Sequence, residues 1–158
     1  MRIFGIDPSV RVLGWGVVEK QDGSFRYVAS DTVYTNPQET MSMRLSKLFK
    51  KLESLIDEYS PNLIAIETAF LKDDPSAFLK LSNVQGVVMA LAGIKGIELK
   101  EVAPTLVKKT LTGNGRAGKE QVRNMVVNVL LNQGIKFSSY DESDSLAIAY
   151  TAGVYFNL

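Results

Sequence analysis

The chain has 158 residues, of which 46% are hydrophobic and 22% charged, with a net charge of +1, and this composition predicts one globular domain over residues 1–158. It contains no cysteine and no histidine, which excludes disulfides, Ser-His or Cys-His catalysis, and zinc sites built from those ligands. We find no apolar stretch that approaches the roughly 20 residues needed to cross a bilayer, and no leader segment. We therefore predict a cytoplasmic protein with no membrane partner.

The first half of the chain predicts three strands, a helix and a fourth strand. Strands are expected at residues 2–7, 13–19 and 25–35, and the short turns between them favour an antiparallel meander. Asn36-Pro37-Gln38-Glu39 predicts a helix start, with Asn36 as the N-cap and Glu39 closing a capping box. Apolar residues at helical spacing continue this helix to Tyr59, and "NLIAIE" then predicts a buried strand.

The second half predicts mostly helices. The expected elements are a helix at 76–94 capped by Asp74, a strand in "IELKEVA", a short helix from Pro104 to Leu111, the basic loop "TGNGRAG", and helices at 119–132 and 139–155. This order favours the α/β class. We predict a mixed five-stranded sheet, its first three strands antiparallel, with helices covering its faces.

Two carboxylates stand at the C-terminal ends of apolar strands, Asp7 and Glu67. Each alone is better explained as a turn residue or a strand-end hydrogen-bond acceptor, but ligands of open α/β sheets bind beyond such strand ends, so two such carboxylates can share a site. Asp141 and Asp144 lie three apart at the start of the last helix, where acidic residues also occur simply because the helix dipole favours them. Four converging carboxylates would repel one another. Two divalent cations would balance them, as in two-metal phosphoryl-transfer sites, and carboxylate oxygens favour Mg²⁺ or Mn²⁺.

Residues 104–125 form a basic segment with a single acid, Glu120. Its cations are Lys108, Lys109, Arg116, Lys119 and Arg123. They could be merely solvated charges, but their clustering around a glycine-rich turn favours contact with phosphates. Phe70 lies three residues after Glu67 in a stretch that reads as a loop, which favours an exposed ring over a core position.

Taken together, these motifs resemble the RuvC Holliday-junction endonucleases of the ribonuclease-H-like superfamily, over nearly the whole chain. "GIDPSVRVLGWGVV" is similar to the first hairpin of that family, "IAIETAF" to its strand with the catalytic glutamate, "LVKKTLTGNGRAGKEQV" to its DNA-contacting segment, and "DESDSLAIA" to its final acidic pair. The glycine-rich loop differs from the family pattern at Arg116 and Gly118.

The resemblance implies a ribonuclease-H-like fold and a homodimer that cuts two opposed strands of a four-way DNA junction with two Mg²⁺ or Mn²⁺ ions per site. It implies metal-binding carboxylates at Asp7, Glu67, Asp141 and Asp144, although some members have histidine at the third of these positions. It also implies DNA contacts by Phe70, Lys108 and Lys119, with Lys119 assisting catalysis. From the clustering of charge we predict that Lys109, Arg116 and Arg123 contact DNA as well. A branch-migration motor is a further partner that the family suggests.

The helix at 76–94 bears on the dimer. Its stretch "VQGVVMALAGI" is apolar on most sides, so one face can cover the sheet while another is left for a second copy. Burial of the whole helix in a thick core is the alternative.

Three alternative functions stay open. The first hairpin also resembles the phosphate loop of actin-like and sugar-kinase ATPases, and the other two alternatives are an RNA-processing ribonuclease-H-like enzyme and a junction-binding module without catalysis.

Overall fold

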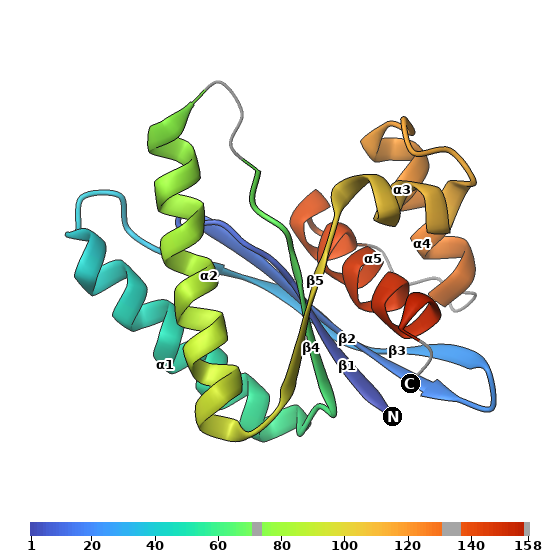
Figure 1. The fold of residues 1–158 in the computed structure, drawn as a ribbon, viewed down its shortest axis with the longest axis horizontal. Helices are drawn as coiled ribbons and strands as arrows, with labels where there is room; N and C mark the ends of the chain where they lie inside the picture. The colour runs from blue at the N-terminus through green and yellow to red at the C-terminus, as the bar shows by residue number, and fades with distance from the viewer. Residues whose placement is uncertain (71–73, 131–136, 157–158) are drawn as a thin grey trace.

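The computed structural model describes residues 1–70, 74–130 and 137–156. Five strands form one sheet in the order β3-β2-β1-β4-β5, with bounds β1 Arg2–Asp7, β2 Val12–Gln21, β3 Ser24–Tyr34, β4 Leu63–Glu67 and β5 Glu98–Val102. The pairs β1–β2 and β2–β3 are antiparallel, and β1–β4 and β4–β5 are parallel. The predicted mixed five-stranded α/β sheet is confirmed, including its antiparallel meander (Figure 1).

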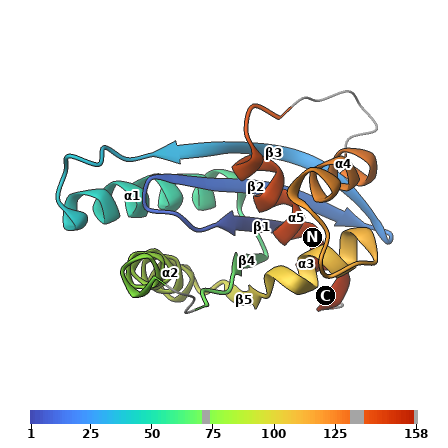
Figure 2. The same cartoon turned by 90° about the horizontal axis from the view of Figure 1, so that it is seen from above.

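Helices cover both faces of this sheet (Figures 1 and 2). On one face lie α1 Met41–Tyr59 and α2 Pro75–Lys95. On the other lie α3 Pro104–Thr112, α4 Lys119–Leu130 and α5 Tyr140–Tyr155. The apolar side chains accordingly form two cores, one between the sheet and α1–α2 and the other between the sheet and α3–α5.

Strand parity decides which residues reach which core. Along β1, Phe4 and Ile6 belong to the core under α1 and α2, whereas Ile3 belongs to the core under α5. Successive side chains of a strand point to opposite faces. Asp7 therefore projects to the α5 face, and Glu67 does the same because Leu63 and Ala65 precede it at alternate positions of that core. The register pairs Ile6 with Ile66, so the two acids follow at the same level of neighbouring strands.

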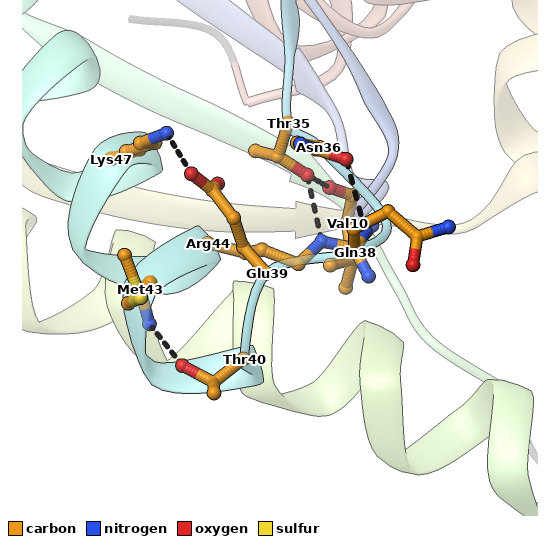
Figure 3. Close-up of polar contacts among 9 residues, drawn as sticks. All are labelled: Val10, Thr35, Asn36, Gln38, Glu39, Thr40, Met43, Arg44 and Lys47. Atoms are coloured by element: carbon orange, nitrogen blue, oxygen red, sulfur yellow. Dashed lines mark hydrogen bonds and ion pairs between the residues drawn. The ribbon is translucent and has the colours of Figure 1, made fainter.

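The predicted start of α1 is wrong by several residues. The helix begins at Met41, and its N-cap is Thr40, whose hydroxyl accepts a hydrogen bond from the Met43 amide (Figure 3). Asn36 instead caps a turn, since its side-chain oxygen accepts from the Gln38 amide at 3.0 Å. Glu39 does not close a capping box but pairs with Lys47.

The other helix signals agree closely with the structure. Asp74 caps α2 by accepting from the amides of Ser76 and Ala77, and Ser139 caps α5 by accepting from the amide of Glu142. We predicted that the helix from residue 119 ends at residue 132, and residues 131 and 132 lie outside the described residues.

Helix α2 is long and apolar enough to meet the length and composition criteria of a membrane span, so our reading that no stretch approaches that length was wrong. This is weak evidence for a membrane. The helix contributes Val84, Val88 and Leu91 to the core beneath it, as a core helix of a soluble domain does, although only 28% of its apolar window is buried. Much of its apolar surface therefore faces outward.

Candidate active site

A cavity of about 210 Å³ opens where β1 and β4 end. It is lined by Asp7, Glu67, Pro104, Val107, Lys108, Lys119, Val122 and Asp144. Three of the four predicted metal-binding carboxylates and two of the predicted DNA-binding lysines thus share one cavity. They come from five elements, β1, β4, α3, α4 and α5, that are far apart in the sequence.

Glycines allow α5 to lie directly on the sheet beside Asp7. A Cβ atom added to Gly14 would lie 2.2 Å from the carbonyl oxygen of Asp141, and one added to Gly5 would lie 2.1 Å from that of Ser145. Such distances are far below any van der Waals contact, so only glycine fits at either position while α5 stays in place. The glycines on β1 and β2 therefore bring the start of α5, with Asp141 and Asp144, up to the strand ends.

Glu142 secures the same end of α5 through hydrogen bonds that its side chain accepts. Its side chain is buried and accepts hydrogen bonds from the hydroxyl of Ser30 on β3 at 3.1 Å and from the amide and hydroxyl of Ser138. A buried carboxylate needs such donors. Glu142 thereby joins α5 to β3, and the apolar run that follows it gave no sign of this long-range contact.

The electrostatics of the cavity indicate a shortage of positive charge. Burial is the main cause that raises the pKa of Asp7 to about 8, and the charges of Asp144, Glu67 and Asp141 add to this rise, while Lys119 opposes it. Burial also raises the pKa of Asp144, again against the effect of Lys119. With a pKa of about 8, Asp7 holds a proton at neutral pH that a divalent cation would displace.

Among the described residues, Lys119 at the start of α4 is the cation that forms an ion pair with these acids. Its ammonium group lies 3.4 Å from a carboxylate oxygen of Asp144, whose charge raises the pKa of Lys119. Because its side chain is 73% exposed, the pair can separate at little cost when a phosphate or metal ion enters. Asp141 does not line the cavity, although its charge still acts on both Asp7 and Asp144.

The donor set fits hard divalent cations. The candidate ligands are all carboxylates, and oxygen ligands are those that Mg²⁺ and Mn²⁺ prefer. Within the described ranges, however, no three acidic side chains already stand in the arrangement of a closed metal site.

The remaining predicted DNA-binding residues lie around this cavity with different local roles. Phe70 follows β4, is 52% exposed, and lines a second hollow that shares Glu67 and Pro104 with the first. Lys109 and Arg116 are exposed. Arg123 donates to the carbonyl oxygen of Phe137 at 2.9 Å and lies over the Tyr140 ring, so it holds the segment that leads into α5.

Comparisons with known proteins identify relatives over the whole length of the chain. The family model described as crossover junction endodeoxyribonuclease RuvC matches residues 3–152. The protein of that name from Rickettsia rickettsii is 40% identical over 99% of both chains, and that from Rickettsia bellii is 38% identical over the same shares. The RuvC structure of Thermus thermophilus superposes with a TM-score of 0.87 at 30% identity, covering 99% of this chain and 96% of the other. The same enzyme solved with a Holliday junction substrate gives an equal TM-score at 27% identity.

Proposed function

The chain belongs to the RuvC family of crossover junction endodeoxyribonucleases, and from this premise we propose that it resolves four-way DNA junctions by hydrolysing phosphodiesters on two opposed strands. The observation that carries the proposal is the cavity in which Asp7, Glu67 and Asp144 meet Lys108 and Lys119. An actin-like ATPase would need a second domain to close over its nucleotide, and a mere binding module would gain nothing from acids facing phosphates.

In the proposed mechanism Asp7 would be the central ligand of a site for two Mg²⁺ ions, for which Mn²⁺ would substitute. Glu67 would complete one ion site, and Asp144 with Asp141 the other. When bound, two such ions would supply the positive charge that lowers the pKa of a water nucleophile and stabilises the leaving 3′ oxygen. Lys119, which the described structure pairs with Asp144, would turn to the scissile phosphate and offset the charge that develops there.

The basic residues around the cavity would hold the cleaved strand. Lys108 lines the cavity and would contact the phosphate chain next to the cleavage position, with Lys109, Arg116 and Arg123 contributing outside it. The exposed ring of Phe70, beside the Glu67 end of the cavity, would stack on bases that are unpaired at the junction centre.

We further propose that the protein works as a homodimer joined through α2. The outward face of this helix carries Leu79, Met89 and Ile94, exposed by 63%, 43% and 66%, together with the small residues Gly86 and Gly93. A Cβ atom at either glycine would meet nothing within 4 Å, so a second helix could approach closely. A two-fold dimer supplies two active sites, and the same two-fold symmetry relates the two cuts in a symmetric junction.

The family suggests a cytoplasmic location and a branch-migration motor as a further partner. A direct test of the proposed activity compares cleavage of a four-way junction, a linear duplex and an RNA–DNA hybrid, each with Mg²⁺ and with EDTA. We expect paired cuts in the junction alone, and only with Mg²⁺. Preferred cleavage of the hybrid would instead identify an RNA-processing enzyme, and junction binding without cleavage would identify a non-catalytic module.

A further inference from the structure

A third hollow, which the proposed mechanism does not use, lies on the α1–α2 side of the sheet, beside the carboxyl end of β1. It has a volume of about 410 Å³ and is lined by Pro8, Ser9, Val10, Arg11, Pro37, Arg44, Ala77, Lys80 and Leu81. We name it the Arg44 groove. Its charged lining consists of three cations, Arg11, Arg44 and Lys80, and none of these forms an ion pair with another described residue.

The groove continues the row of hollows that begins at the active site. The cavity that holds Asp7 shares Glu67 and Pro104 with the hollow beside Phe70, and that hollow shares Ala77 and Leu81 with the Arg44 groove. Pro8 and Ser9 of the groove also follow Asp7 directly in the chain. A nucleic-acid strand, with its evenly spaced phosphates, could therefore run from the scissile position past the carboxyl ends of the strands to these cations.

The structure holds Arg44 in place before any ligand arrives. Its Nε donates to the hydroxyl of Thr35 at 2.9 Å, and this hydroxyl donates to the carbonyl oxygen of Val10 (Figure 3). Thr35 as a whole is only 6% exposed. The Thr35 amide in turn donates to the carbonyl oxygen of Arg11 at 3.1 Å. Among the described residues, Thr35 is the hydrogen-bond partner of this side chain, and it engages Nε alone. The two terminal nitrogens thus stay available for a bidentate contact with a phosphate.

From this geometry we infer that the Arg44 groove binds the phosphate backbone of a junction arm on the α1–α2 side of the protein. The inference rests on the proposed function and adds a second contact surface to it. An acidic protein segment would also suit three cations, but the continuity with the active-site cavity favours the strand that the active site itself holds.

The test measures junction binding in Ca²⁺ over a series of salt concentrations, using the full chain. Arg11 and Lys80 are exposed, so the double variant R11A/K80A should keep the fold. Each lost phosphate contact lowers the slope of log affinity against log salt by about one. We expect a slope lower by about two and about a tenfold loss of affinity at 0.1 M salt. R44Q should lose affinity as well, with a melting temperature recorded to separate binding from folding.

The matched control is K50A/K51A, which removes two exposed cations from α1 outside the groove and should keep the parent's slope. An equal loss in both double variants, or a parent slope in R11A/K80A, would overturn the assignment. Ethylation of phosphates in one arm should interfere with binding of the parent but not of R11A/K80A. Cleavage by the parent is scored alongside: a parent that cuts no junction contradicts the proposed function, whereas a parent that cuts while R11A/K80A binds normally contradicts the groove alone.

Discussion

Replacing Asp7 by Asn should stabilise the metal-free protein while abolishing cleavage. Burial and three neighbouring carboxylates raise the pKa of Asp7 from its ordinary 3.8 to about 8, so the folded chain holds a proton that the unfolded chain releases. A carboxyl with a raised pKa makes the free energy of unfolding fall as the pH rises between these two values, and the penalty is complete above pH 8. Asparagine carries no such charge and escapes the penalty.

The magnitude follows from the width of this interval. One pH unit corresponds to about 1.4 kcal/mol, so the rise from pH 5 to the folded pKa near 8 sets a ceiling of ~4 kcal/mol. Asp7 is partly exposed, and water and small movements relieve part of the penalty. We therefore expect the Asn variant to gain about 2 kcal/mol over the parent between pH 5 and pH 8.5. For a domain of this size that is about 4–8 °C in melting temperature.

The assay is thermal unfolding followed by circular dichroism in EDTA at both pH values. Asp22 lies exposed in the turn between β2 and β3, so Asp22→Asn is the control and should show no pH-dependent gain. Added Mg²⁺ should reduce the difference in melting temperature between the Asn variant and the parent at pH 8.5, because Mg²⁺ stabilises the parent by binding to it. A pH-independent difference between Asp7→Asn and the parent would refute the electrostatic reasoning, and near-parental cleavage by that variant would remove Asp7 from the mechanism.

Other expected outcomes concern the basic segment and the dimer. Lys119→Ala should slow single-turnover cleavage at saturating protein about a hundredfold and weaken binding much less, because its role is at the transition state; a loss of affinity alone would contradict that role. Arg116→Ala should weaken junction binding about threefold and lower its salt slope by about one without changing structural preference, which titrations at several salt concentrations would measure. Met89→Glu should split the dimer in sedimentation because Met89 is exposed, whereas Val88→Glu should lower the melting temperature because Val88 is fully buried. A parent that sediments as a monomer at micromolar concentration yet makes paired cuts would contradict the dimer.

The sequence was sufficient to predict the sheet and the ends of most helices, because these follow from local patterns. The start of α1 could not be predicted in this way. Asn36 and Thr40 are both residue types that cap helices, and Asn is the stronger of the two, so the local sequence favours the wrong residue. The segment before the helix is also held by a hydrogen bond from the Thr35 hydroxyl to the carbonyl oxygen of Val10, a contact that exists only in the folded chain. The pairing of Lys119 with Asp144 likewise depends on how α4 lies against α5, for which the local sequence carries no signal.

The candidate site was likewise predictable only where its residues follow from the local sequence. Asp7 and Glu67 could be placed from strand ends alone, and strand parity then explains why they share a face with α5. The hydrogen bond from Ser30 to Glu142 and the close approach of Asp141 to Gly14 join residues more than a hundred positions apart in sequence, and no sequence periodicity predicts them.

The glycines beneath α5 also determine how this enzyme should respond to mutation. At Gly5 and Gly14 main-chain atoms of the helix rest on main-chain atoms of the sheet, so backbone contact at these two positions holds the separation between Asp7 and Asp144. Cavity-forming substitutions in the core between α4 and α5 should then lower the melting temperature while the metal-ion dependence of the surviving folded enzyme stays constant. Stability and metal affinity would thus vary separately in this fold, and a random mutant library sorted for both should show little correlation between them outside the glycine positions.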